Sequence, residues 1–244
     1  MASRLLRSAL ALGALTLLIA GCTSAPGDSP APTSSAGADA GQPGDGRDEE
    51  PEPGDVEAAW LDDGRGFAVV TWGSSGCVPH AAETVADGQT VTVTLQDRPA
   101  DAVCTMDFAP RASFAALPQG VDPTRDVRVR VRYGDVSGDA ELEALPAAPD
   151  GDSGVLTGKA SAGWFDDQGL VLLTWGSGSC RPVVEEVVQS AAGATVTFAP
   201  FDGVCTADMA PRTTVIVLPS EPEDDAPFTL TVRDGDAQTE VPVR

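Results

Sequence analysis

Positive charge and proton-transferring side chains are scarce in this sequence. Its 15 Lys and Arg residues face 37 Asp and Glu residues, a formal net charge of −22, and it has one histidine, His80. Nucleic-acid binding depends on neutralising phosphates with Lys and Arg, so we expect no nucleic-acid partner. A Ser-His-Asp triad needs a histidine base, and His80 is the only histidine in the sequence that could serve as one. We therefore expect a non-catalytic protein.

The first 21 residues have the layout of a secretory signal. Arg4 and Arg7 precede an uncharged apolar run over residues 8–20, which ends in the small residues Ala20 and Gly21. The run is shorter than the roughly 20 residues that span a bilayer. We therefore predict a signal peptide over residues 1–21 that is removed on export.

The cleavage site resembles the lipobox of bacterial lipoproteins. Ile19-Ala20-Gly21-Cys22 places small residues before a cysteine. This resemblance implies that Cys22 carries diacylglycerol and palmitate and becomes the mature N-terminus. Several acyl chains on one residue anchor a protein durably. We expect a lipid-anchored protein on the extracytoplasmic face of the cell membrane.

Residues 22–55 lack the side chains needed for a core. Beyond Cys22 they contain no Val, Leu, Ile, Met or aromatic residue, and they end in the acidic run 48–55. Such a segment cannot offset the entropy of ordering it. We predict a disordered tether that spans about 30 Å as a flexible coil and about 100 Å when extended.

The rest of the chain is a tandem duplication, which predicts two copies of one module. Residues 56–145 and 159–244 flank a turn-rich linker, 146–158. The matching segments are Trp60-Leu-Asp-Asp63 with Trp164-Phe-Asp-Asp167, Thr71-Trp-Gly-Ser74 with Thr174-Trp-Gly-Ser177, and Val103-Cys-Thr-Met-Asp-Phe-Ala-Pro-Arg111 with Val204-Cys-Thr-Ala-Asp-Met-Ala-Pro-Arg212.

The repeat also predicts how the cysteines pair. Cys22 has no counterpart, and each module holds two cysteines in matching positions. An even number in an exported chain favours disulfides, here Cys77–Cys104 and Cys180–Cys205. A metal site would need paired C-x-x-C spacing, which is absent. We expect no metal or cofactor.

Alternation with a period of two predicts an all-β fold. Residues 90–95 and 127–132 alternate apolar and polar side chains, and Asp63-Gly64 and Asp87-Gly88 are typical of hairpin turns. No amphipathic helix is evident. About seven or eight short strands per module favour two antiparallel sheets packed face to face, an immunoglobulin-like sandwich in the broad sense.

Several recurring side chains have both a structural and a functional interpretation. The tryptophan pairs suit either a ligand groove or the core, and we favour the core. The Gly-Ser loops 73–76 and 176–179 depart from the G-x-S-x-G pattern, so we predict loops that cap the strand before each disulfide. His80 is replaced by Val183 in the second copy. The turns Asp150-Gly-Asp152 and Asp234-Gly-Asp236 lack an EF-hand ligand series.

Charged side chains leave two further alternatives open. Asp107 with Arg111, and Asp208 with Arg212, suit an ion pair that orders the Ala-Pro turn, or a ligand site used twice. A basic stripe suits anionic wall polymers, or cross-strand pairing with Glu141 and Glu143, which we favour. The stripe consists of Arg125, Arg128, Arg130 and Arg132.

The modules resemble repeat domains of uncharacterised actinobacterial lipoproteins with a Trp-Gly-Ser-Ser…Cys-Pro signature, here Trp72 to Pro79. That resemblance implies no activity. We expect modules that bind or scaffold in the cell envelope, with an envelope protein or wall polymer as partner. The alternatives are a passive spacer, and a hydrolase or enzyme accessory domain that uses surface carboxylates.

Overall fold

The structure, a computed structural model, confirms the all-β prediction. It describes residues 51–98, 102–150, 155–223 and 226–244, so the predicted signal peptide, Cys22 and most of the predicted tether lie outside it. The described part holds fourteen strands and one short 3-10 helix at Asp62–Gly64. The strands of the first module are β1 (Val56–Leu61), β2 (Gly66–Gly73), β3 (His80–Asp87), β4 (Thr90–Gln96), β5 (Ala109–Ala116), β6 (Val127–Tyr133) and β7 (Val136–Leu142). Those of the second are β8 (Ser161–Trp164), β9 (Gly169–Gly176), β10 (Val184–Ser190), β11 (Gly193–Phe198), β12 (Ala210–Val217), β13 (Thr229–Asp234) and β14 (Ala237–Pro242).

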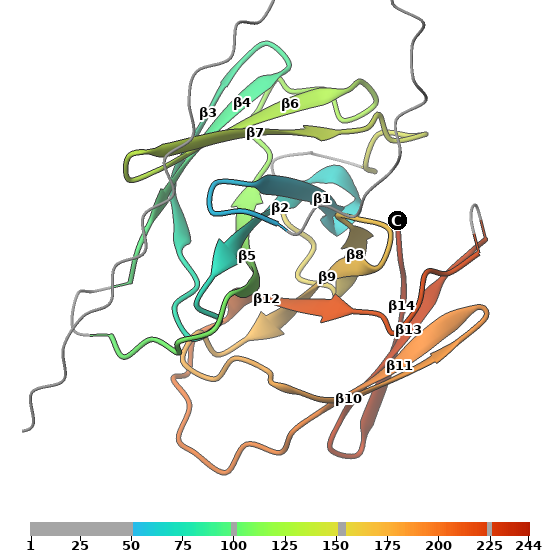
Figure 1. The fold of residues 1–244 in the computed structure, drawn as a ribbon. Helices are drawn as coiled ribbons and strands as arrows, with labels where there is room; N and C mark the ends of the chain where they lie inside the picture. The colour runs from blue at the N-terminus through green and yellow to red at the C-terminus, as the bar shows by residue number, and fades with distance from the viewer. Residues whose placement is uncertain (1–50, 99–101, 151–154, 224–225) are drawn as a thin grey trace, which may run out of the picture. The chain divides into compact units, whose positions relative to one another are not determined.

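Each module is a two-sheet sandwich, as the sequence predicts. In the first, a sheet in the order β1-β2-β5 packs on a sheet in the order β3-β4-β6-β7, and the second repeats this order with β8-β9-β12 and β10-β11-β13-β14 (Figure 1). The sheets are antiparallel except that β4 pairs with β6, and β11 with β13, in parallel. The alternating pattern alone does not indicate these parallel pairs.

The core of each sandwich follows from the alternation. Along β4 and β6 the valines point inward and are fully buried or nearly so, whereas the threonines and arginines between them face outward. The predicted hairpin turns are present, with Asp62–Gly64 between β1 and β2 and Gly88 between β3 and β4. Within the described ranges, no helix has the length and apolar character needed to cross a membrane.

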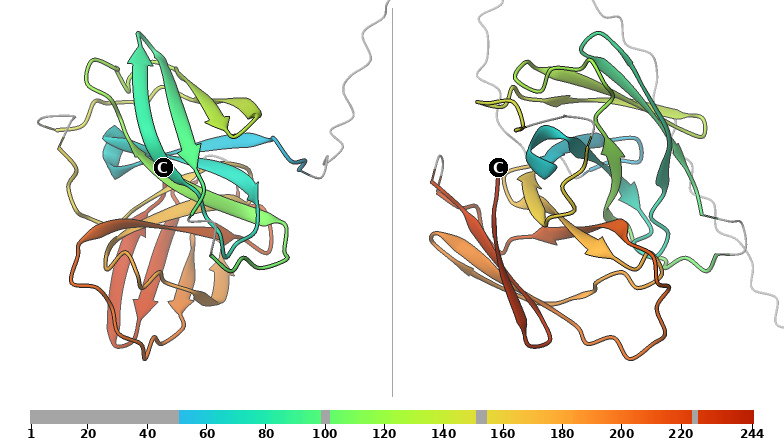
Figure 2. Two further views of the ribbon diagram at one scale, coloured as in Figure 1. Left: turned by 90° about the vertical axis from the view of Figure 1, so that its left-hand side faces the viewer. Right: turned by 180° about the vertical axis from the view of Figure 1, so that it is seen from behind.

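The two modules share a third core, which we call the seam. Residues Asp48–Arg244 form one compact unit, and a cluster of buried side chains joins the two three-stranded sheets inside it. Figure 2 shows these two sheets between the four-stranded ones. The seam cluster consists of Ala59, Leu61, Ala68, Val70, Ala112, Phe165, Val171 and Leu173. The central strands β2 and β9 are therefore buried on both faces over most of their length.

Backbone contacts hold the seam closely. A Cβ atom added to Gly163 would lie 2.2 Å from the carbonyl oxygen of Trp60, so β8 approaches β1 at a distance only glycine permits. The Thr213 hydroxyl donates a hydrogen bond across the seam to the Ala112 carbonyl (2.6 Å). The modules therefore pack as one body rather than as beads on a linker.

The linker is tied to the first module at one buried carboxylate. Asp62 is 2% exposed, and its carboxylate accepts hydrogen bonds from the backbone N–H of Thr157 (2.9 Å) and from the Thr157 hydroxyl. The Asp62 N–H donates to the Ser161 hydroxyl (2.8 Å), and Asp63 forms an ion pair with Arg244 (2.8 Å). The turn that contains Asp62 and Asp63 therefore holds the chain at both ends of the second module, at Ser161 near its start and at Arg244 at its end.

Candidate functional site: a cleft at the seam

The disulfides form as the repeat predicts. Cys77 is bonded to Cys104 and Cys180 to Cys205, with Cα–Cα distances of 5.2 and 5.6 Å. Each joins the segment after a central strand to the long loop before β5 or β12. They staple one end of each sandwich.

Each Gly-Ser loop is held by the segment that carries the second cysteine. In the first module the backbone N–H of Ser75 donates to the Asp107 carboxylate (3.1 Å) and that of Gly76 to the Thr105 hydroxyl (3.0 Å). In the second, Gly178 donates to Asp208 (3.0 Å). The predicted structural role of these loops is confirmed.

Hydrogen bonds from Ser75 and Thr105 lower the pKa of Asp107 to about 2. An unfolded aspartate titrates near 4, so the stabilisation from this carboxylate is present above about pH 4 and is lost as the pH falls through about 2. We expect the Asp107 carboxyl carbon to titrate with a midpoint near 2 in an NMR pH series. A midpoint near 4 would contradict the capping geometry.

The predicted Asp–Arg ion pairs are wrong. Arg111 donates to the carbonyl oxygen of Cys77 (2.8 Å) and stacks on Tyr133 (5.4 Å to the ring centre). The Asp107 carboxylate instead accepts a hydrogen bond from the Gly-Ser loop. Arg212 donates in the same way to Cys180 (3.0 Å). Four residues along extended chain span about 13 Å, too far for the two side chains to meet.

Three arginines of the stripe, Arg128, Arg130 and Arg132, face solvent on β6, and Arg125 lies exposed just before this strand. Arg128 lies opposite Glu141, and Arg130 lies opposite Asp139, not Glu143, and pairs with it (3.4 Å). Arg132 lies opposite Ser137. Glu141 is therefore on the predicted neighbouring strand, but no ion pair joins it to Arg128 among the described residues. The predicted pairing with Glu143 is wrong, because Glu143 follows the end of β7.

The four tryptophans have three different environments. Trp60 is buried in the first core, as predicted, and its indole N–H donates to the Glu143 carbonyl (2.7 Å). Trp164 packs on the second core against Phe228. Trp72 and Trp175 are partly exposed at the seam, where they make edge-on contacts with Phe165 and Phe114 of the opposite module.

The two edges of the seam differ in a way that creates a cleft. At one edge the Trp175 indole N–H donates to the carbonyl oxygen of Lys159 (3.0 Å), at the start of the second module. At the other edge Trp72 and Phe165 form the wall of an open cleft of about 620 Å³. That volume falls in the range of small-ligand sites.

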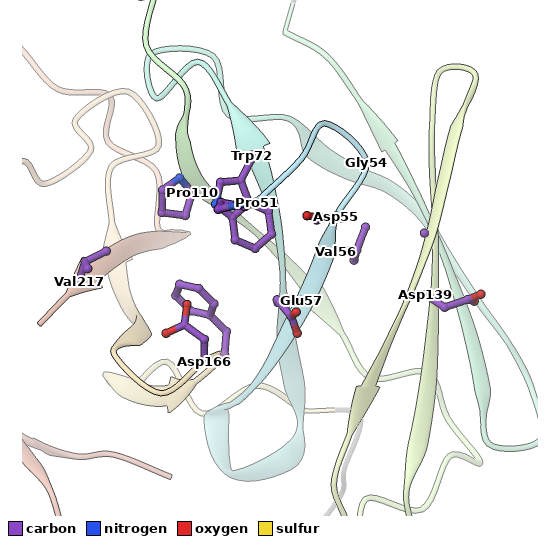
Figure 3. A pocket seen from close by; sticks show the side chains of 12 residues that line it. Pro51, Gly54, Asp55, Val56, Glu57, Trp72, Pro110, Asp139, Asp166 and Val217 are labelled. Carbon is purple, nitrogen blue, oxygen red and sulfur yellow. The ribbon is translucent and has the colours of Figure 1, made fainter. Parts of the chain in front are cut away.

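Both modules contribute to this seam cleft (Figure 3). It is lined by Pro51, Gly54, Asp55, Val56, Glu57, Trp72, Pro110, Gly138, Asp139, Phe165, Asp166 and Val217. A narrower recess of about 120 Å³ adjoins it behind Trp72. The recess shares Gly54, Asp55, Val56, Trp72 and Gly138 with the cleft, and its remaining walls are Pro53, Thr71, Val131, Tyr133 and Val136.

Negative charge gathers at the mouth of the cleft. Burial raises the pKa of Glu57, and the charges of Asp166 and Asp55 raise it further. Asp139 is paired with Arg130, and Asp166 accepts a hydrogen bond from the Gln168 N–H (2.8 Å). Glu57 has neither an ion-pair nor a hydrogen-bond partner in the described part of the chain. A positively charged ligand would relieve this repulsion.

Sequence reasoning missed Glu57, Asp166 and Phe165, because their proximity depends on how the modules pack. Cys22 lies outside the described residues. Within those residues, no three His, Cys, Asp or Glu side chains are grouped so as to hold a metal ion. Comparison of the chain with protein-family models, curated proteins and solved structures found no match.

Proposed function

We propose that the protein is an exported lipoprotein, anchored by Cys22 to the extracytoplasmic face of the cell membrane, whose two modules form one non-catalytic binding unit. The observation that carries the binding role is the seam cleft, which has an aromatic wall and lining residues from both modules. The signal and lipobox pattern at the N-terminus supports the anchor. Its partner is a component of the cell envelope.

The anchor is tested by Cys22→Ala in the full chain. We expect the variant to leave the membrane fraction or to remain unprocessed, because the thiol that receives lipid is absent. The measurement is fractionation with mass spectrometry of the N-terminus. Unchanged membrane association and processing would refute the anchor.

The binding role is tested by photo-cross-linking in intact cells. A benzoylphenylalanine at Val217 lies in the cleft, and one at Val85 lies on the outer sheet of the first module; the two side chains are similarly exposed (56% and 50%). We expect an adduct, identified by mass spectrometry, at Val217 alone. Equal labelling at both sites, or none at Val217, would favour a passive spacer.

The cleft carboxylates favour a second candidate function, acid–base hydrolysis. A carboxyl group with a raised pKa, here that of Glu57, beside a second carboxyl group such as that of Asp166 is the arrangement of a general acid and its partner. The adduct at Val217 separates the two functions. A cross-linked ligand that is intact supports binding. A ligand that is cleaved by the unaltered protein but stays intact with the Glu57→Gln variant supports hydrolysis.

A further inference from the structure

We propose that the seam cleft binds an organic cation, a primary ammonium or guanidinium group on an aliphatic stem, such as a lysine or arginine side chain. This deepens the proposed binding function and rests on it. Three properties of the cleft support it: an aromatic wall, uncompensated negative charge and an apolar recess.

The aromatic wall distinguishes the cleft from an ordinary acidic surface. Trp72 and Phe165 meet edge-on with ring centres 6.5 Å apart, and both line the cleft. A cation held over the face of an indole gains about 0.5–2 kcal/mol. At the opposite edge Trp175 makes a similar edge-on contact with Phe114 (6.3 Å), but the residue equivalent to Phe165 is there the aliphatic Leu61.

The charge at the cleft selects a cation. Asp55, Glu57 and Asp166 all line it, and none of the ion pairs in the described residues neutralises them. A metal ion is a poor fit, because the described carboxylates do not converge as a ligand set. A diffuse organic cation needs no such convergence, since the aromatic face and carboxylates attract it from different sides.

The recess behind Trp72 accounts for the stem. It is a small space of about 120 Å³ whose walls include Val131, Tyr133 and Val136. Lysine and arginine carry three or four methylene groups that favour apolar surroundings while the charged head stays at a polar mouth. Cleft and recess together therefore match an amphipathic cation rather than a small inorganic one.

The test is an NMR titration of the full chain with two probes that differ in one terminal ammonium group. The probes are N-acetyl-lysine amide and N-acetyl-norleucine amide, and the readout is the shift of the Trp72 indole N–H. We expect the lysine probe to bind at least about tenfold more tightly, and less tightly as salt increases. Equal affinity for the two probes would overturn the proposal.

A matched pair of variants assigns the charge to the cleft. Glu57→Gln should weaken lysine-probe binding about five- to tenfold. Glu186→Gln, which removes the same charge from the exposed face of β10, should change it less than twofold. Equal effects of the two variants would overturn the proposal.

Glu57→Gln is also expected to fold. Its raised pKa means that the charged form is disfavoured in the folded state, so the loss of that charge should preserve or increase thermal stability at pH 7. Weaker binding then reflects the lost charge rather than unfolding.

The outcomes separate this inference from the proposed function. If the norleucine probe shifts Trp72 as strongly as the lysine probe, the cation specificity is wrong and the binding role stands. If neither probe shifts Trp72 and Val217 gives no cross-link, both are wrong.

Discussion

Replacement of Phe165 by alanine should lower the free energy of unfolding of the two-module unit by about 3–5 kcal/mol. Phe165 is 7% exposed, belongs to the seam cluster and contacts Trp72 of the first module. Its removal leaves a void that neither three-stranded sheet fills without moving. The loss should therefore destabilise both modules, although the substitution lies in one.

Urea denaturation followed by far-UV circular dichroism measures this loss. The control is Phe201→Ala, which removes the same ring from a loop position that is 60% exposed and should cost less than about 0.5 kcal/mol. Equal destabilisation by the two variants would contradict the seam. The seam would also be contradicted if Phe165→Ala changed only the unfolding signals of the tryptophans in the second module.

Removal of the disulfide Cys180–Cys205 by paired serine substitutions should cost about 3.5 kcal/mol. The bond closes a loop with a sequence separation of 25, which limits the entropy of the unfolded chain. Cys205 lies in a run of nine consecutive exposed residues, 201–209, which contributes no buried side chain to the core. The disulfide therefore contributes much of the stability of this end of the second module.

The matched variant removes Cys77–Cys104, whose separation is 27, and should cost a similar amount. Urea denaturation under non-reducing conditions measures both. A loss below about 0.5 kcal/mol in either variant would mean that the hydrogen bonds of the Gly-Ser loops hold the ends without the disulfide.

The sandwich fold was predictable because the apolar side chains of strands in its outer sheets point to one face of the sheet. Alternation in β4 and β6 marks one buried face, and the repeat assigns the cysteine pairs without geometry. The seam also has a signal in the sequence: Phe67-Ala-Val-Val and Leu170-Val-Leu-Leu are continuous apolar runs, which are typical of strands buried on both faces. These two runs lie in β2 and β9, which are buried on both faces.

The cleft was not predictable from periodicity. Trp72 is predicted to lie in the core, yet it forms the wall of the cleft. Glu57 lies on β1, whose other residues are buried. Its proximity to Asp166 arises only when β1 packs beside the turn before β9. A local pattern does not encode contacts between residues more than 100 positions apart.

The charged pairs show a related limit. Asp107 and Arg111 are spaced as a helix would need them for an ion pair, but Asp107 lies in the loop before β5 and Arg111 lies within β5. The Asp107 carboxylate accepts a hydrogen bond from the Ser75 N–H, and Arg111 donates to the Cys77 carbonyl oxygen. Side-chain spacing predicts contact only after the secondary structure is known.

Differential scanning calorimetry of the full chain tests most directly whether the two modules form one body. A shared seam predicts a single transition in which the calorimetric and van't Hoff enthalpies agree. Two resolved transitions, or a calorimetric enthalpy about twice the van't Hoff value, would show that the modules unfold independently. That result would contradict the seam, and with it the cleft that the seam creates.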